Sequence, residues 1–191
     1  MEVPKVLPIL RLSYLVIKEV LSIMDPQDFI SIYKISLKFK KIAIVCSKQH
    51  PIFKYCLELV IDNKPMIEVK RTDKDFVYNI DLEDERPEKD LIDEFKEYAE
   101  YVMEVFGWPV THIDYSLDDF PAQNKSIIDW FKLHVKSSDN CNLWGGKLAE
   151  EPLTYYLHNM EISKDLTIGV QVKDDFRLNL RQNIPCLEIT N

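Results

Sequence analysis

The chain has 191 residues, of which 46% are hydrophobic and 29% charged, and its formal net charge is −8. This composition is typical of a folded soluble protein, and the length suits one domain or one domain with a small appended module. Because phosphate binding needs dense positive charge, the acidic balance argues against nucleic acid as the main ligand. Only four glycines occur, which nearly excludes a glycine-rich phosphate loop.

The charge is spread unevenly along the chain. Residues 1–60 hold nine Lys/Arg and five Asp/Glu, a net charge of +4, so the remainder carries −12. A modestly basic N-terminal part would suit an acidic protein partner. A solvated charged surface explains the same distribution, and the counts do not separate the two interpretations.

The first predicted helix runs from about Tyr14 to Ile23. Lys18 and Glu19 lie on its polar side and interrupt the apolar stretch, so it is too broken for a membrane span, which needs ~20 mostly apolar residues. At about 100° per residue, the apolar residues cover close to half of the circumference. They are Val16, Ile17, Val20, Leu21, Ile23 and Met24.

A second helix is predicted from about Pro26 to Val45, with Asp25 as its N-cap and Pro26 at the first helical position. It carries two apolar stripes. One holds Phe29, Ile32, Ile35, Phe39, Ile42 and Ala43, and the other holds Ile30, Tyr33, Leu37 and Ile44. Two stripes require two packing partners. The first helix is one, and the other is either the rest of this chain or a different protein.

After Pro51 the pattern changes to short β-rich runs. Residues 55–62, 66–71 and 76–82, separated by turn-forming residues, predict three antiparallel strands. An acidic linker follows, and a helix then begins at Pro87-Glu88 and ends at Gly107. One side of that helix is apolar, with Leu91, Ile92, Phe95, Tyr98, Val102 and Val105.

The C-terminal part repeats a strand-and-helix unit. Strands are predicted at 110–117, 141–146, 165–172 and 186–190, and helices at 125–135 and 150–160. Leu143, Leu166 and Leu187 begin similar short strands, 23 and 21 residues apart, which matches the ~20–29 residue period of leucine-rich repeats. The asparagine ladder of a true leucine-rich repeat is missing. The pattern therefore predicts an irregular β/α solenoid, which is usually a binding surface rather than a catalytic pocket.

The best candidate for chemistry is "HIDYSLDD" at residues 112–119. On a strand, His112 and Asp114 would share one face, with Asp118 and Asp119 in the following loop. Such a cluster would hold a divalent cation or act in acid-base catalysis. A strand running into a solvated acidic loop explains the same residues. We therefore assign no catalytic residue, no metal ligand and no cofactor from the sequence.

Four cysteines, Cys46, Cys56, Cys141 and Cys186, form no CxxC pair, and no secretory signal is convincing. They indicate reduced, mostly buried thiols of an intracellular protein, cytoplasmic or nuclear. Trp130 is predicted to lie in the core. For Trp144, which is followed by two glycines, burial is favoured over a surface contact.

Residues Leu10–Ile42 resemble an F-box. The family pattern has Leu-Pro, an Ile/Val-Leu pair, Asp-Pro-x-Asp-Leu and a hydrophobic-Cys-Lys-x-Trp stretch, and these fall without a gap at Leu12-Ser13, Val20-Leu21, Asp25–Phe29 and Ile35–Phe39. Ser13, Ser36 and Phe39 depart from the usual proline, cysteine and tryptophan. "LVIDNKP", "KSIIDWFK" and "CLEITN" are similar to parts of the type-2 F-box-associated region of the large nematode F-box group. That region normally continues into further repeats, so the resemblance implies one shortened at its C-terminal end.

The resemblance implies an α+β protein with an F-box-like helical module at 7–50 and an irregular leucine-rich-repeat-like β/α region at 51–191. Such a chain would be the substrate-recognition subunit of an SCF-type cullin ubiquitin ligase and not itself an enzyme. It would bind an SKP-type adaptor, through it a cullin, and an unknown target protein, but neither nucleic acid nor membrane. The adaptor-binding residues carried over are Leu12, Leu15, Val20, Leu21, Ile23, Pro26, Phe29, Ile32 and Phe39.

One alternative needs no partner for the N-terminal helices. Any repeat stack requires capping elements at its ends, so these helices would simply cap the solenoid of a non-enzymatic scaffold or interaction protein.

Overall fold

The computed structural model describes residues 11–24, 28, 41–42, 45, 55–71, 77–81, 88–173, 176–178, 180 and 182–190. The chain alternates helices and strands after its first helix. In order, the elements are α1 (Tyr14–Ile23), β1 (Tyr55–Ile61), β2 (Met66–Arg71), β3 (Val77–Asp81), α4 (Glu88–Phe106), β4 (Val110–Ser116), α5 (Asn124–His134), β5 (Ser137–Gly145), α6 (Glu150–Asn159), β6 (Glu161–Val170) and β7 (Cys186–Ile189).

All the strands join one seven-stranded sheet in the order β3-β2-β1-β4-β5-β6-β7. The pairs β1–β2 and β2–β3 are antiparallel, as predicted. The other four pairs, β1–β4, β4–β5, β5–β6 and β6–β7, are parallel. A mixed helix-and-strand protein is thus confirmed, but α+β is the wrong class. Helices alternate with mostly parallel strands, which is an α/β arrangement.

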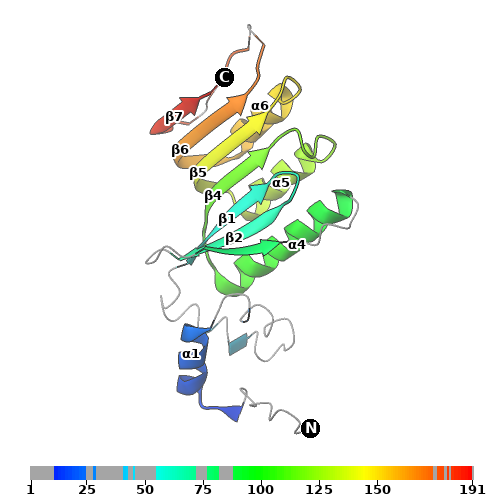
Figure 1. Ribbon diagram of the computed structural model, residues 1–191. Coiled ribbons are helices and arrows are strands. Elements are labelled where there is room, and N and C mark those ends of the chain that lie inside the picture. Colours follow the sequence, from blue (N-terminus) through cyan, green and yellow to red (C-terminus); the bar gives the residue numbers. More distant parts are fainter. Residues whose placement is uncertain are drawn as a thin grey trace.

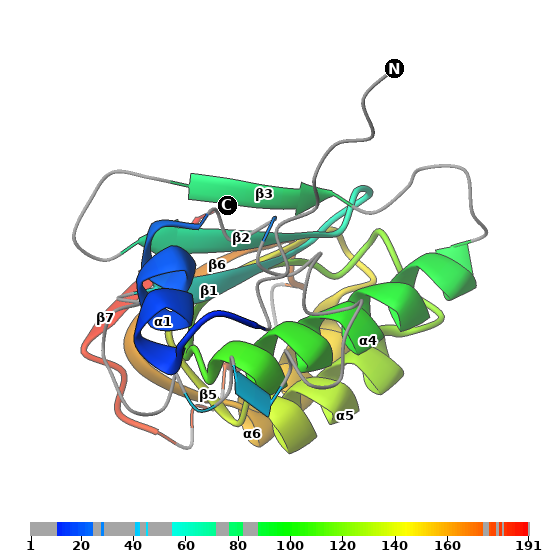
Figure 2. The ribbon, with the colours of Figure 1, turned by 90° about the horizontal axis from the view of Figure 1, so that it is seen from below.

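Helices α4, α5 and α6 lie side by side against one face of the sheet (Figures 1 and 2). They cover the strand residues that point toward them. In β4, for example, Ile113 and Tyr115 are buried, whereas His112, Asp114 and Ser116 on the other face are half-buried. Among the described residues, no helix covers this second face. We call it the open face.

Helix α4 shows why the predicted helices form. Leu91, Ile92, Phe95, Ala99 and Val102 recur every three or four residues and are all buried. Gly107 follows in the left-handed region, at φ +62, and its N–H donates to the Met103 carbonyl at 2.8 Å. That conformation favours glycine and ends the helix where the sequence predicts.

The leucines predicted to begin strands lie inside them instead. Leu143 is the seventh residue of β5 and Leu166 the sixth of β6, because both strands begin with polar residues that the pattern did not include. The strand pairing shows which positions of successive repeat units correspond. Ile113 pairs with Cys141, Cys141 with Leu166, and Leu166 with Leu187.

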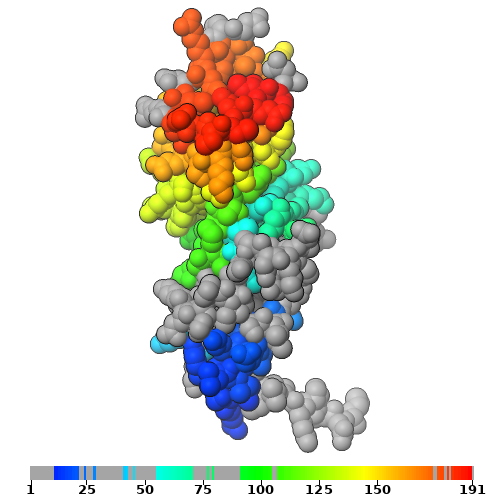
Figure 3. All heavy atoms as spheres, turned by 90° about the vertical axis from the view of Figure 1, so that its left-hand side faces the viewer, coloured from blue at the N-terminus to red at the C-terminus, as the bar shows by residue number. Residues whose placement is uncertain are grey.

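Helix α1 lies beyond the β1–β2–β3 end of the sheet, at the opposite end of the molecule from β7 (Figures 1 and 3). Its bounds match the prediction. The second predicted helix, 26–45, lies outside the described residues except for Asp28, Lys41, Ile42 and Val45, which are helical. The boundary between 7–50 and 51–191 also lies outside them and stays a prediction. No helix in the described parts of the chain is long and apolar enough to cross a membrane.

Candidate functional site

The first turn of α1 exposes three consecutive apolar side chains. Tyr14 is 42% exposed, Leu15 69% and Val16 45%. Ile17 and Leu21 are buried in the hydrophobic core. At about 100° per residue, Leu15 and Val16 lie on the other side of the helix, whereas Tyr14 lies on the side of Ile17 and Leu21 and is exposed at its N-terminal end. We call Tyr14, Leu15 and Val16 the α1 surface. It is continuous with half-buried Val20, which lies one turn after Val16 on the same side.

The structure divides the nine predicted adaptor-binding residues. Leu15 is exposed, Leu12 and Val20 are half-buried, and Leu21 is 1% exposed. Leu21 therefore belongs to internal packing, and its assignment to a docking surface is wrong. Val16, which periodicity placed on the apolar half of the helix, is exposed. Ile23 ends α1, but its side chain is not described, and Pro26, Phe29, Ile32 and Phe39 lie outside the described residues.

His112 and Asp114 share one face of β4, as predicted, and both side chains contact Asn142 on the neighbouring strand. Asn142 Nδ2 lies 3.1 Å from His112 Nε2 and donates to Asp114 Oδ2 at 3.2 Å. Asp118 instead accepts from the Gly146 N–H at 2.5 Å. The described residues contain no group of three His, Cys, Asp or Glu side chains able to hold a metal. The cluster is thus a hydrogen-bonded part of the open face.

Trp144 lies on the open face and is 39% exposed, so the favoured prediction of burial is wrong. Its Nε1 donates to Asp114 Oδ1 at 2.9 Å. A Cβ at Gly169, the paired position on β6, would come within 2.3 Å of Trp144 Cε3. The ring therefore lies across Gly169. A glycine inside a predicted strand is the one sequence signal of such a close approach. Trp130, by contrast, is buried as predicted.

Acidic side chains dominate the open face. Glu58 and Glu68 lie opposite each other on β1 and β2, and Lys70 pairs with both. Farther along the sheet, Asp114, Asp165 and Glu188 make no ion pair with a Lys or Arg of the described chain. The adjoining Asp139–Lys164 pair at 2.7 Å is neutral overall. The open face thus carries net negative charge toward its β7 end.

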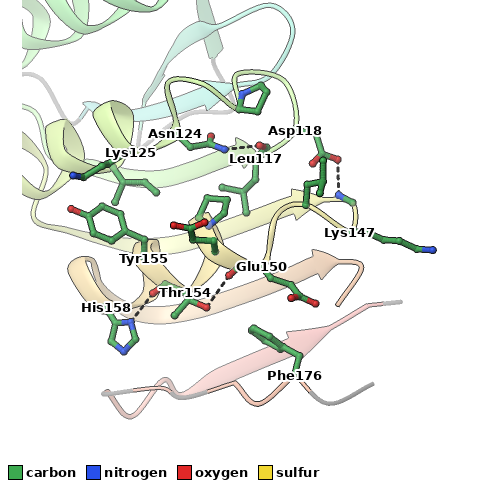
Figure 4. A pocket seen from close by; sticks show the side chains of 16 residues that line it. Leu117, Asp118, Asn124, Lys125, Lys147, Glu150, Thr154, Tyr155, His158 and Phe176 are labelled. Carbon is green, nitrogen blue, oxygen red and sulfur yellow. Dashed lines mark hydrogen bonds between the residues drawn. The ribbon is translucent and has the colours of Figure 1, made fainter. Parts of the chain in front are cut away.

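A groove of about 1140 Å³ lies at the carboxyl ends of β4 and β5, between the first turns of α5 and α6 (Figure 4). Ligands of α/β proteins often bind at this edge. Here the polar groups hold the loops together: Asn124 Nδ2 donates to the Leu117 carbonyl at 2.8 Å, and Lys173 donates to Glu150 through its N–H and its ammonium group. The two hydrogen bonds from Lys173 lower the pKa of Glu150. We assign the groove a structural role.

Two of the described cysteines, Cys141 and Cys186, have raised pKa values. Cys141 is buried and lies 3.2 Å from the Tyr156 hydroxyl, and burial raises its pKa to about 12. Cys56 is half-buried, while Cys186 is exposed on β7, where a hydrogen bond to Asp165 raises its pKa. The expectation of mostly buried cysteines thus holds for Cys141 but not for Cys186. Cys46 lies outside the described residues.

No family model, no curated protein and no solved structure matches the chain. The F-box resemblance therefore stays a prediction drawn from residues 10–42 and the segments quoted with it.

Proposed function

We propose that the chain is the substrate-recognition subunit of an SCF-type cullin ubiquitin ligase. The α1 surface would contact an SKP-type adaptor, and the β/α region would hold a target protein. The chain would catalyse no step itself. It would raise the effective concentration of the target near the ubiquitin-loaded enzyme.

The observation that carries this proposal is the exposure of Tyr14, Leu15 and Val16 within the F-box-like segment. Single exposed apolar residues are common on protein surfaces and need no explanation. Leu15 and Val16 are different, because the same helix already buries Ile17 and Leu21 on its other side. A second protein that covers the α1 surface would remove this apolar area from water.

The sheet supports the leucine-rich-repeat-like part of the proposal. From β4 to β7 the strands are parallel and adjacent in chain order, and helices α5 and α6 lie on one side. Register-aligned positions on successive strands are 28, 25 and 21 residues apart, within the ~20–29 residues typical of that repeat class. This arrangement leaves one broad sheet face for a target.

Titration calorimetry with a purified SKP-type adaptor tests the proposal. The full chain should bind, and Leu15→Asp combined with Val16→Asp should abolish binding, because both substitutions place charge on the α1 surface. Leu133→Asp is the matched control, since Leu133 is 68% exposed and belongs to α5, which lies against the sheet away from α1 (Figure 1). Variants at Leu21 are unsuitable because that residue is buried. Failure of the folded wild-type chain to bind the adaptor would refute the proposal.

Burial of Ile17 and Leu21 favours the alternative of a scaffold whose N-terminal helices cap the β/α stack. Capping requires only this inward side of α1. On that account the chain ignores the adaptor, and the Leu15→Asp and Val16→Asp variant behaves as the wild type in every binding measurement.

A further inference from the structure

We propose that the open face binds a basic, extended segment of the target protein, with Trp144 as its central contact. The inference deepens the proposed function, on which it rests, by naming the chemistry that the receptor recognises. Three features of the open face support it: the fixed indole ring, the carboxylates that form no ion pair with a described Lys or Arg, and the absence of a covering helix in the described chain.

The indole ring of Trp144 is held in one position. Its Nε1 donates to Asp114 Oδ1 at 2.9 Å, and its six-membered ring lies across Gly169, where a Cβ would come within 2.5 Å of both Cε3 and Cζ3. The ring is nevertheless 39% exposed. A fixed aromatic surface loses little conformational entropy on binding, and tryptophan is the ring that attracts an arginine or lysine cation most strongly.

Carboxylates lie in the two rows that precede this ring along the strands. The register places Asp114 in one row with Asn142, Thr167 and Glu188, and His112 in the next row with Asn140 and Asp165. Among the described residues, no Lys or Arg forms an ion pair with Asp114, Asp165 or Glu188. A cation stacked on Trp144 would lie close to the Asp114 carboxylate, so cation–π attraction and charge attraction would act together.

The same charges exclude other occupants. Nucleic acid would place phosphates against the carboxylates and be repelled. A segment with alternating cationic and small polar residues fits better. Neighbouring strands are about 4.8 Å apart, so an extended segment crossing β4 to β7 would pass Asp114 and Glu188, which lie in one row.

Fluorescence anisotropy tests the inference, with two labelled probe peptides and the full chain. One peptide alternates arginine with serine, and the other alternates glutamate with serine. The arginine peptide should bind, the glutamate peptide should not, and raising NaCl from about 50 mM to about 500 mM should weaken binding severalfold. Trp144→Ala should lower the affinity about tenfold, and Trp144→Phe should lower it less.

A matched pair of double variants separates the open face from general acidity. Asp165→Asn with Glu188→Gln removes two exposed charges from the open face and should weaken arginine-peptide binding about tenfold. Glu97→Gln with Glu151→Gln removes two exposed charges from helices α4 and α6 and should change it less than twofold. Unchanged far-UV circular dichroism would show that each variant is folded.

Three results would overturn the inference: equal binding of both peptides, equal effects of the two double variants, or full binding by folded Trp144→Ala. A dimer of the chain alone that Trp144→Ala dissociates would also overturn it, because the open face would then belong to a second copy. None of these results affects adaptor binding through the α1 surface. A failure here is therefore distinguishable from a failure of the proposed function.

Discussion

Helices α1 and α5 have almost the same length, ten and eleven residues, but they use their apolar side chains differently. Helix α5 buries Ile127, Ile128, Trp130 and Phe131, and only Leu133 among its large apolar residues is exposed. Helix α1 buries Ile17 and Leu21 and exposes three apolar residues in its first turn. The sheet and neighbouring helices bury four of the five large apolar side chains of α5, whereas α1 leaves Tyr14, Leu15 and Val16 exposed.

This difference separates stability from binding. Substitutions in the sheet-backed helices should alter the free energy of unfolding, while substitutions on the α1 surface should alter adaptor binding and leave unfolding nearly unchanged. Each of the following experiments tests one part of that separation.

The largest contrast is expected between two identical leucine truncations. Leu153→Ala in α6 removes a side chain with 0% exposure and should lower the free energy of unfolding by about 2–5 kcal/mol. Leu15→Ala in α1 removes one that is 69% exposed and should change it by no more than about 0.5 kcal/mol. Urea denaturation measures both. Similar losses for the two variants would mean that Leu15 is part of the fold.

A smaller effect is expected at the start of α5, where Asn124 is buried. It accepts a hydrogen bond from the Tyr115 hydroxyl, and its Nδ2 donates to the Leu117 carbonyl at 2.8 Å. Asn124→Ala leaves both partners without these bonds and should cost about 1–3 kcal/mol in thermal or urea unfolding. Adaptor affinity should not change, and a parallel loss of both properties would show that α5 and α1 are coupled.

Substitutions just after the C-terminal ends of α4 and α5 should change the free energy of unfolding in opposite directions. Gly107 and Lys136 both have left-handed φ values, +62 and +66. Gly107→Ala should cost about 1 kcal/mol, because an L side chain is strained in that region. Lys136→Gly should relieve the same strain, offset by the greater freedom of glycine in the unfolded chain, and should stabilise by about 1 kcal/mol or less. Destabilisation by both changes would contradict this account.

The smallest expected effect is a dependence of stability on pH, caused by Asp139. Hydrogen bonds from Lys164 and Ser163 lower the pKa of Asp139 in the folded protein below its unfolded value. A carboxyl group of this kind contributes stability above its unfolded pKa and loses it as the pH falls below about 4. The pair is exposed, so the contribution is small. Asp139→Asn should therefore reduce the urea midpoint slightly at pH 7, and this reduction should shrink as the pH falls below about 4.

Local patterns predicted most of the elements. The bounds of α1, the three antiparallel strands and helix α4 follow from periodicity, turn residues and Gly107, all of which act within a few residues. The early starts of β5 and β6 did not follow, because Ser137–Asn140 are polar and Glu161–Lys164 hold a single apolar residue, Ile162. They become strands through pairing with neighbouring strands rather than through propensity.

The site features depend on contacts between distant residues. Trp144 and Gly169 meet because β5 and β6 are parallel in one register, and neither residue reveals that register. Periodicity placed Leu21 correctly on an apolar side of α1, but which side faces the interior is decided by the rest of the molecule. The same limitation explains why the sequence did not distinguish exposed Val16 from buried Ile17 and Leu21.

Hydrogen–deuterium exchange of the full chain, with and without an SKP-type adaptor, tests the central claim most directly. Because the α1 surface should be covered in the complex, peptides spanning residues 11–24 should exchange more slowly when the adaptor is present. Peptides from β4 to β6 should exchange at the same rate in both samples. Unchanged exchange in residues 11–24, or protection confined to the sheet region, would contradict the claim that α1 meets a second protein.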